Sequence, residues 1–343
     1  MAANNRFAVE TGSILIMKHF TSVHDIGPLE QALAKAREIK KDKFAYADAG
    51  KHLTLLLVFF NASLRTRLST QKAAENLGMH VMVLNIKKGA WLLETQHGVV
   101  MDGDKAEHLL EAIPVMGCYA DVIGVRSFAG LTSKEEDYGE TVLNQFIRYS
   151  GKPVISLESA TRHPLQSFAD LITIEEYKTV AKPKIVLSWA PHPSALPQAV
   201  ANSFAEWVLA AGYSLTITHP KNYELHNAFT AGADIVYDQE EALQGAHFVY
   251  AKNWSAFQDP FYGKRLHGDL SWTIDERKMA LTDNAWFMHC LPVRRNVVVS
   301  DKVLDSPRSL VIPQAANREI AAQIVCKSMI DSIKQKSHEV KRI

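Results

Sequence analysis

Short apolar runs alternate with amphipathic stretches along most of the 343-residue chain. The segment Thr54–Phe60 is an unbroken apolar run that stops at the turn-like sequence Asn61-Ala62-Ser63. Runs of about four to eight apolar residues between turn signals are typical of strands that are buried on both faces. We therefore predict strands at residues 54–60, 80–86, 121–125 and 153–157, and a second set at 184–190, 213–218, 233–237, 247–251, 286–289 and 309–312.

Strands that alternate with helical patterns indicate βαβ units and parallel sheets. The predicted strands fall into groups of four and six, with the helix-like segment Ser167–Tyr177 between them. This predicts an α/β protein of two doubly wound domains, each a parallel sheet flanked by helices, with an active-site cleft between them. The helical stretch Asn317–Lys336 has no strand after it and is expected to pack back on the first domain. The predicted domains are therefore residues 17–162 with 317–343, and residues 163–316.

Composition narrows the classes of function. The chain has 38 basic and 37 acidic residues, a formal net charge of +1, and thus no broad basic surface for nucleic acid. No stretch approaches the roughly 18 apolar residues of a membrane span, and the N-terminus does not resemble a signal peptide. Met17 offers an alternative start, which would make residues 1–16 a leader or an added extension. Cys118, Cys290 and Cys326 form no C-x-x-C pair, which argues against disulfides and structural zinc and favours a cytoplasmic protein.

An anion site is predicted where the first strand ends. The segment Ser63–Arg67, of sequence SLRTR, follows the strand, and a helical pattern begins at Leu68. A helix that starts beyond a parallel strand aims the free N–H groups of its first turn at the sheet edge where ligands bind. Together with two guanidinium groups, these donors fit an oxyanion of phosphate geometry. On this motif alone, a surface turn with two solvated arginines is about equally favoured.

A second polar cluster is His163-Pro164-Leu165-Gln166, after the last strand of the first set. Proline favours the first turn of a helix, so His163 is predicted at the cap and Gln166 one turn on, on the same side. An imidazole N–H and an amide placed in this way would grip a polarised carbonyl and its NH2 group. Arg126 ends the preceding strand, at the same ligand-binding edge. A capping histidine with a surface glutamine, and a solvent-facing arginine, remain the alternatives at this point.

Two further strand ends bear on the chemistry. His289-Cys290-Leu291-Pro292 ends a strand and runs into the segment Val293–Asn296, which holds two arginines. A lone buried cysteine is usually a small core residue, but this position favours a ligand contact for Cys290. The stretch after residues 184–190, PHPSALPQAVANS, has three prolines and no glycine. A dinucleotide fold would need a G-x-G-x-x-G sequence there, so a nicotinamide or flavin enzyme is disfavoured.

In their order and spacing, three motifs resemble those of the aspartate/ornithine carbamoyltransferase family. They are SLRTR (Ser63–Arg67), HPLQ (His163–Gln166) and HCLP (His289–Pro292). Arg126 and Asn317-Arg318 also fit the family pattern, and the resemblance covers nearly the whole chain. It implies transfer of a carbamoyl group from carbamoyl phosphate to an amine.

The resemblance also implies roles for single residues, with no cofactor and no metal. Thr66, Arg126 and His163 would donate to the carbonyl oxygen as charge develops on it, and Gln166 would hold the carbamoyl NH2 group. Leu64 replaces the family's usual threonine and should matter little, because backbone N–H groups hold much of the phosphate. The expected carbamoyl-phosphate set is Ser63, Leu64, Arg65, Thr66, Arg67, Trp91, Arg126, His163, Gln166, Cys290, Leu291 and Arg318; the catalytic candidates among these are Arg126, His163, Gln166 and Cys290.

The resemblance further implies that the acceptor is an N-acylated ornithine. The chain lacks the S-M-G loop of ornithine enzymes and has HCLP where aspartate enzymes have HPLP. Enzymes that act on acetylornithine carry a glutamate at the position of Ala106, whereas this alanine would not repel a second carboxylate. We therefore expect N-succinylornithine as the acceptor, with N-acetylornithine as the alternative. The expected acceptor-binding residues are Trp91, Ala106, Glu158, Lys252, Cys290, Leu291 and Arg294.

The family resemblance implies a homotrimer with shared active sites, in which a loop carrying Trp91 reaches the neighbouring subunit and the two domains close on binding. No nucleic-acid or membrane partner is expected. A non-catalytic carbamoyl-phosphate or anion-binding module is the alternative from another class, but it would not need SLRTR, HPLQ, Arg126 and HCLP together. Metal-dependent hydrolysis is disfavoured because H-E-x-x-H and comparable ligand spacings do not occur.

Overall fold

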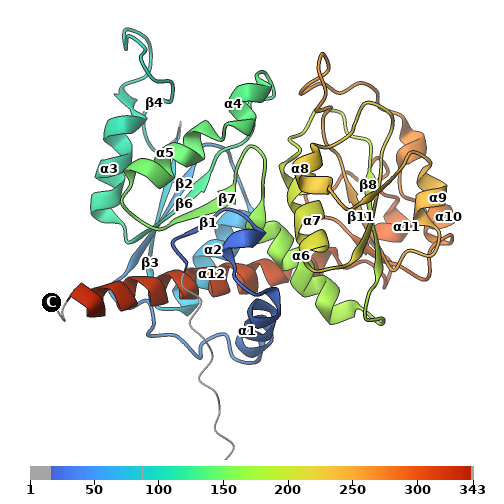
Figure 1. Ribbon diagram of the computed structural model, residues 1–343, viewed down its shortest axis with the longest axis horizontal. Helices are drawn as coiled ribbons and strands as arrows, with labels where there is room; N and C mark the ends of the chain where they lie inside the picture. The colour runs from blue at the N-terminus through green and yellow to red at the C-terminus, as the bar shows by residue number, and fades with distance from the viewer. Residues whose placement is uncertain (1–16, 87, 341–343) are drawn as a thin grey trace, which may run out of the picture.

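The computed structural model describes residues 17–86 and 88–340, which form two five-stranded sheets beside each other (Figure 1). The strand order is β1-β7-β6-β2-β3 in the first sheet and β10-β9-β8-β11-β12 in the second. Every pairing between these strands is parallel. The prediction of two parallel-sheet domains flanked by helices is confirmed. The proposed leader at residues 1–16 lies outside the described residues.

The strands begin and end close to the apolar runs from which they were predicted. The first sheet consists of β1 (His19–Phe20), β2 (Thr54–Phe59), β3 (His80–Asn85), β6 (Val122–Arg126) and β7 (Val154–Glu158). The second consists of β8 (Lys184–Trp189), β9 (Ser214–Thr218), β10 (Asp234–Val236), β11 (Phe248–Lys252) and β12 (Trp286–Met288). A separate pair of short strands is formed by β4 (Leu93–Glu94) and β5 (Glu107–His108).

Helices connect the strands and cover the sheets. They are α1 (Leu29–Lys41), α2 (Arg65–Asn76), α3 (Leu109–Tyr119), α4 (Lys134–Tyr138), α5 (Thr141–Tyr149), α6 (Pro164–Tyr177), α7 (Ala199–Ala210), α8 (Asn227–Thr230), α9 (Gln239–Leu243), α10 (Glu276–Met279), α11 (Asp301–Leu304) and α12 (Val311–Val340), with 3-10 turns η1 (Val23–Asp25) and η2 (Leu270–Trp272). None of the described helices has the length and apolar character that a membrane span requires.

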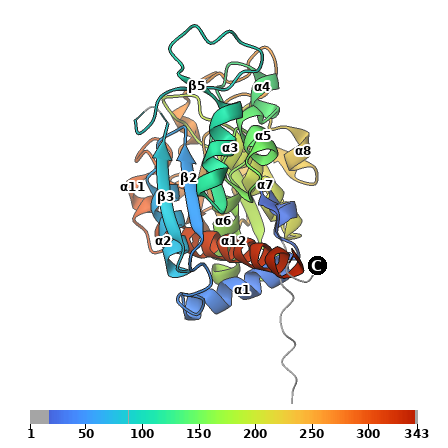
Figure 2. The ribbon, with the colours of Figure 1, turned by 90° about the vertical axis from the view of Figure 1, so that its left-hand side faces the viewer.

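Alternating side chains of the first sheet pack into two separate cores. Leu56 and Val58 of β2 face α3 and α5, whereas Leu55 and Leu57 face the side covered by α2 and α12 (Figure 2). This follows from the two-residue period of a strand, and burial on both faces explains the unbroken apolar sequence of β2.

The last helix, α12, connects the two halves of the molecule. It packs against α1 and α2 beside the first sheet and against α6, the helix that leads into the second half (Figure 1). Polar contacts secure it, because Lys43 Nζ and Asn76 Nδ2 lie 2.8 and 2.7 Å from the Glu319 carboxylate. The chain therefore returns to the first sheet after completing the second.

Two predictions about the strands are wrong. The sheets contain five strands each, rather than four and six, because the two-residue strand β1 belongs to the first sheet. The predicted strand at residues 309–312 is not formed: Ser309 makes only an isolated bridge with Phe287, and α12 begins at Val311. A short apolar run cannot be assigned to a strand or a buried helix start from its pattern alone, and Pro313 in the first turn favours the helix.

Candidate functional site

A cavity of about 630 Å³ lies at the carboxyl ends of the strands, between the two halves. Residues from SLRTR, HPLQ and HCLP meet there with side chains from the ends of β6, β7 and β11 and from α12. The lining residues are Ala62, Ser63, Leu64, Arg65, Thr66, Arg126, Phe128, Glu158, His163, Gln166, His192, Leu196, Pro197, Val200, Lys252, Cys290, Leu291, Pro292 and Arg318.

The start of α2 forms one wall of the cavity. The hydroxyl of Ser63, just before the helix that begins at Arg65, accepts a hydrogen bond from the Thr66 backbone N–H at 3.2 Å. The Thr66 hydroxyl oxygen accepts from Arg126 Nη1 at 3.1 Å and from Arg318 Nη2 at 2.6 Å. Its oxygen thus takes up two guanidinium donors, which leaves the hydroxyl's own proton for a ligand.

Arg126 meets a carboxylate because of an irregularity in the sheet. The register between β6 and β7 shifts after Val125, so that Arg126 pairs with Glu158 and not with Leu157. Arg126 Nη1 lies 2.6 Å from Glu158 Oε2, and His163 Nε2 lies 3.3 Å from the same oxygen. All three side chains are buried, and the Glu158 carboxylate lies beside both sequence-predicted donors.

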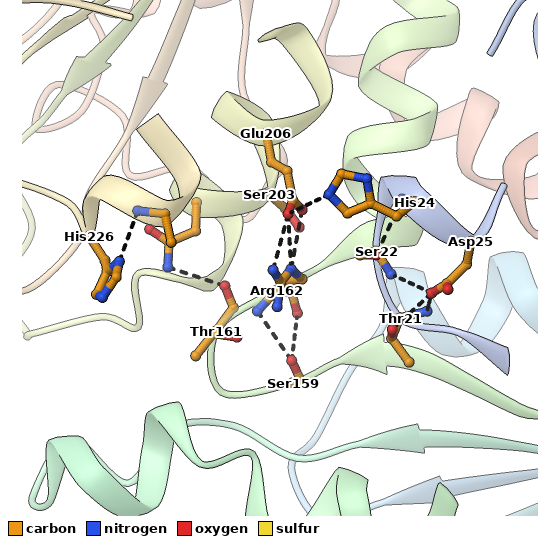
Figure 3. A network of polar contacts seen from close by, with 12 residues as sticks. Thr21, Ser22, His24, Asp25, Ser159, Thr161, Arg162, Ser203, Glu206 and His226 are labelled. Atoms are coloured by element: carbon orange, nitrogen blue, oxygen red, sulfur yellow. Dashed lines mark hydrogen bonds and ion pairs between the residues drawn. The ribbon is translucent and has the colours of Figure 1, made fainter. Parts of the chain in front are cut away.

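The loop between β7 and α6, which carries His163, is held by the second half of the molecule (Figure 3). The Arg162 guanidinium binds the Glu206 carboxylate of α7 through Nε at 3.2 Å and Nη2 at 3.1 Å. The Ser203 hydroxyl accepts from the His163 backbone N–H at 2.9 Å. Within the loop, Ser159 N–H donates to the Arg162 carbonyl at 2.8 Å. These contacts fix the position from which α6 starts.

Burial keeps two of the candidate groups uncharged. It lowers the pKa of His163 well below its ordinary value, and Arg318, Arg126, Lys252 and Arg65 lower it further. The imidazole is therefore neutral at pH 7 and offers one N–H donor. Burial also raises the pKa of the Cys290 thiol, so Cys290 is not a thiolate nucleophile.

Arg318 reaches the cavity from α12 and contacts Gln166 as well as Thr66. Its Nη1 donates to Gln166 Oε1, whose amide belongs to the first turn of α6. Burial lowers the pKa of Arg318 to about 10, with Arg126 as the next cause, so the guanidinium remains charged at neutral pH. Arg318, predicted at the end of the chain, is thus placed beside residues some 150 and 250 positions earlier.

The second half contributes Lys252 from the end of β11 and the segment Cys290–Pro292 after β12. His192, which none of the sequence motifs indicated, also lines this wall. Its Nε2 accepts from Arg294 Nε at 3.1 Å, and its Nδ1 lies 3.0 Å from the Ser194 carbonyl oxygen and 3.1 Å from the Ser194 backbone nitrogen. His192 follows the end of β8, a position that the strand-end rule indicates. From the sequence, that stretch was informative only through its missing glycines, which exclude a dinucleotide site.

Four predicted site residues do not line the cavity of this chain. Arg67 turns along α2, with Nε 3.3 Å from Gln71 Oε1. Trp91, which precedes β4, is 60% exposed and donates to Glu107 of β5, and the exposed Ala106 directly precedes Glu107. Arg294 is exposed and reaches the cavity only through His192. The other predicted residues are brought together.

The cavity has the charge and the donors to hold an anion. Four cationic side chains line it, Arg65, Arg126, Lys252 and Arg318, against the single carboxylate of Glu158. Within the described residues, the buried Nε groups of Arg65, Arg126 and Arg318 have no hydrogen-bond partner. Buried donors are rarely left unpaired, so their concentration here indicates a ligand with several acceptor oxygens. The described residues contain no cluster of histidine, cysteine and carboxylate side chains suited to a metal.

Comparisons with known proteins agree with this geometry. Residues 18–176 match the family domain described as the carbamoyl-P binding domain of aspartate/ornithine carbamoyltransferase, and residues 197–328 match its Asp/Orn binding domain. A protein of Bacteroides thetaiotaomicron named N-succinylornithine carbamoyltransferase is 63% identical over 317 residues, covering 92% of this chain and 100% of the relative. A protein of Xanthomonas axonopodis pv. citri named N-acetylornithine carbamoyltransferase is 38% identical, covering 88% and 93%.

Solved structures of similar proteins share the fold. An acetylornithine transcarbamylase complexed with acetylcitrulline is 36% identical, with a TM-score of 0.85 and coverage of 91% of this chain and 99% of that one. A variant of N-acetyl-L-ornithine transcarbamylase with one glutamate replaced by alanine, complexed with carbamyl phosphate and N-succinyl-L-norvaline, has the same identity and TM-score, and coverage of 91% and 100%.

Proposed function

Because this chain belongs to the aspartate/ornithine carbamoyltransferase family and is a carbamoyltransferase, we propose that it transfers the carbamoyl group of carbamoyl phosphate to the side-chain amine of N-succinyl-L-ornithine. The products are N-succinyl-L-citrulline and phosphate. Arg65, Arg126, His163 and Arg318 converge on one cavity, and this convergence carries the proposal. We place the reaction in the cytoplasm and in arginine biosynthesis.

The phosphate of carbamoyl phosphate is proposed to bind at the start of α2. Ser63, Arg65 and Thr66, the backbone at Leu64, and Arg318 supply the donors, and Arg67 completes the set if ligand binding turns it from Gln71. The unpartnered Nε groups support these roles, because a phosphate group has enough acceptor oxygens to satisfy them. The carbamoyl group would then lie between Thr66, Arg126, His163 and Gln166, near Cys290 and Leu291.

Transfer needs alignment and stabilisation of charge. The neutral amine attacks the carbonyl carbon, a C–N bond forms, and negative charge develops on the oxygen, which Thr66, Arg126 and His163 stabilise as donors. The C–O bond to phosphate then breaks, and the departing phosphate takes the proton of the amine. A neutral His163 fits this scheme, because it acts as a hydrogen-bond donor and no step requires it to be an imidazolium.

The carboxylates of the acceptor are proposed to bind to the cationic side chains that the second half contributes to the cavity wall. Lys252 lines the cavity, and Arg294 is held at its rim by His192, so both can approach an N-acyl amino acid. Glu158 is proposed to orient the side-chain amine. In the solved complex with N-succinyl-L-norvaline, one glutamate of the acetylornithine enzyme is replaced by alanine. We infer that this glutamate corresponds to Ala106 of the present chain. Identity of 62–63% to two proteins named for N-succinylornithine, against 38% to one named for N-acetylornithine, supports the succinyl group over the acetyl alternative.

The same segment supports a shared site. Trp91 and Ala106 lie together on an exposed segment and outside the cavity of their own chain. We propose a homotrimer in which this segment completes the acceptor site of a neighbouring subunit. Within each subunit, residues 17–162 with 317–343 are proposed as the carbamoyl-phosphate domain and residues 163–316 as the acceptor domain; the packing of α12 on α1 and α2 supports placing the C-terminal helix with the first of these.

The test is phosphate release by the purified protein with carbamoyl phosphate and each of three acceptors: N-succinylornithine, N-acetylornithine and ornithine. We expect the highest kcat/KM with N-succinylornithine. Turnover of N-acetylornithine without turnover of N-succinylornithine would make the acetyl compound the substrate. Tight carbamoyl-phosphate binding with no product from any acceptor would favour a non-catalytic binding module.

A further inference from the structure

Behind the cavity, the fully buried carboxylate of Asp170 accepts hydrogen bonds from two glutamine side chains. Gln166 Nε2 and Gln314 Nε2 each lie 2.7 Å from Asp170 Oδ1. Gln166 is one turn before Asp170 on α6, and Gln314 belongs to the first turn of α12. One carboxylate oxygen therefore links two helices that both reach the cavity wall.

The Asp170 carboxylate determines the orientation of the Gln166 and Gln314 side-chain amides. An amide has nearly the same shape in both orientations, but one end donates and the other accepts, whereas a carboxylate only accepts. Each NH2 group therefore faces Asp170. Gln166 Oε1 faces the cavity wall and accepts from Arg318 Nη1, and Gln314 Oε1 accepts from the His289 backbone N–H at 3.0 Å. A reversed Gln166 would point its NH2 group at the Arg318 guanidinium, donor against donor.

We propose that Asp170 is a positioning residue that sets the orientation of the Gln166 amide, and thereby lets the site select a carbamoyl NH2 group over a methyl group. Asp170 does not line the cavity within the described residues, so it acts through Gln166. The inference rests on the proposed function, in which Gln166 Oε1 accepts a hydrogen bond from the carbamoyl NH2 group. Through Gln314, the same carboxylate also supports the segment that leads to Cys290.

The surroundings of Asp170 predict which substitution will be tolerated. Burial raises its pKa to about 7, while hydrogen bonds from Gln166 and Gln314 and the charge of Arg318 lower it; Tyr250 of β11 also faces it. A proton on Oδ2 leaves Oδ1 able to accept from both amides. The oxygen of an asparagine side chain can do the same, so Asp170→Asn should keep both glutamines in place, whereas Asp170→Leu keeps the branched side-chain skeleton and removes the acceptor.

Acetyl phosphate provides the probe, because it carries a methyl group where carbamoyl phosphate carries NH2. The dissociation constants of both compounds are measured for the wild type, Asp170→Asn, Asp170→Leu and Gln166→Leu by calorimetric titration. Thr173→Val is the matched control, because Thr173 is also a buried polar residue of α6 whose hydroxyl accepts from α12, through Asn317 Nδ2 at 2.9 Å. Its contacts do not include the cavity residues.

We expect the wild type, Asp170→Asn and Thr173→Val to prefer carbamoyl phosphate by the same ratio. Asp170→Leu should lose about tenfold of this preference, as should Gln166→Leu, which corresponds to one misdirected hydrogen bond. If Asp170→Leu does not fold, Asp170→Ala carries the same expectation. An unchanged preference in the folded Leu or Ala variant, or an equal loss in Asp170→Asn, would overturn the inference. A wild type without any preference would instead contradict the proposed role of Gln166.

Discussion

At the scale of single residues, the cavity is built on shared acceptors. The Thr66 hydroxyl oxygen accepts hydrogen bonds from Arg126 and Arg318. The Glu158 carboxylate forms an ion pair with Arg126 and lies beside His163. These contacts hold the guanidinium groups in fixed directions while their Nε groups remain unpartnered. A phosphate-bearing substrate would thus meet donors that are already oriented, which reduces the entropic cost of binding it.

The acceptor choice is predicted to depend on Ala106. We expect Ala106→Glu to lower kcat/KM with N-succinylornithine by tenfold or more, because like charges about 4 Å apart repel by roughly 1 to 4 kcal/mol. Ala106→Gln, similar in size but neutral, is the control and should have a smaller effect. Steady-state kinetics with both acylated acceptors measures this. An equal loss in the two variants would show that size, and not charge, controls the acceptor.

The buried Asp170 should affect how stability depends on pH. Its pKa rises from an ordinary 3.8 to about 7 in the folded state, so between pH 4 and 7 the folded protein binds more protons, and this contribution to stability is lost as the pH rises. Buried His163 and His289 have lowered pKa values and act in the opposite direction. Because these histidine contributions cancel in the comparison, Asp170→Asn should gain stability relative to the wild type from pH 5 to 7.5.

Urea midpoints of the two proteins, measured across this range, check the prediction. A stability difference that does not change with pH would contradict the raised pKa of Asp170. If the stability of Asp170→Asn no longer falls with pH as that of the wild type does, while its preference for carbamoyl phosphate is unchanged, both the buried charge and the positioning role of Asp170 are supported.

Sequence motifs predicted most of the site, and the exceptions have physical reasons. Arg65, Arg126, His163, Gln166, Cys290 and Arg318 meet because the carboxyl ends of parallel strands share one edge. Asp170 contacts Gln166 behind the cavity wall and His192 lies just after β8, and neither belongs to one of the three motifs. The roles of Trp91 and Ala106 stay predictions, because they require a second subunit.

At the scale of elements, the loop between β7 and α6 decides where His163 lies. Glu140, at the start of α5 with a left-handed backbone (φ 51°), accepts from Ser159 Oγ at 2.6 Å, Ala160 N at 3.2 Å and Thr161 N at 2.9 Å. Arg162, in the same loop, is held by Glu206 of α7 (Figure 3). The loop is thus fixed by carboxylates from both halves of the molecule.

Loss of the Glu140 carboxylate should destabilise the protein. We expect Glu140→Ala to lower the free energy of unfolding by about 2 kcal/mol, because several loop donors lose a charged acceptor, and Glu140→Gln by about 1 kcal/mol, because one oxygen remains. The exposed Glu135→Ala is the control and should change it by less than about 0.5 kcal/mol. Urea unfolding at pH 7.5 gives these values. An effect of Glu140→Ala no larger than that of the control would refute the role of this carboxylate.

Elements that bury a long apolar run were predictable, and short ones were not. The run Thr54–Phe60 gave β2 to within one residue, whereas β1 has only two residues and no recognisable period. The start of α12 was mistaken for a strand because its first residues are apolar. The pair β4 and β5 is equally short and is set by tertiary contacts that a local pattern does not contain.

At the scale of the whole molecule, the proposed trimer makes each active site depend on two chains. Trp91→Ala and Arg318→Gln should each abolish most activity. Refolding an equal mixture of the two variants should restore up to about a quarter of the wild-type activity, because some sites then combine an intact Arg318 with an intact neighbouring Trp91. Activity of the mixture that does not exceed the sum of the separate variants would contradict a shared site.

The central claim is that the cavity aligns carbamoyl phosphate with an acylated ornithine for direct transfer. The most direct measurement follows 13C-labelled carbamoyl phosphate by NMR in the presence of the protein and N-succinylornithine. We predict that the labelled carbon moves into the ureido group of N-succinylcitrulline, and that Arg126→Gln slows this transfer strongly. Label that appears only in the products of spontaneous carbamoyl-phosphate breakdown, at the rate seen without protein, would contradict the account.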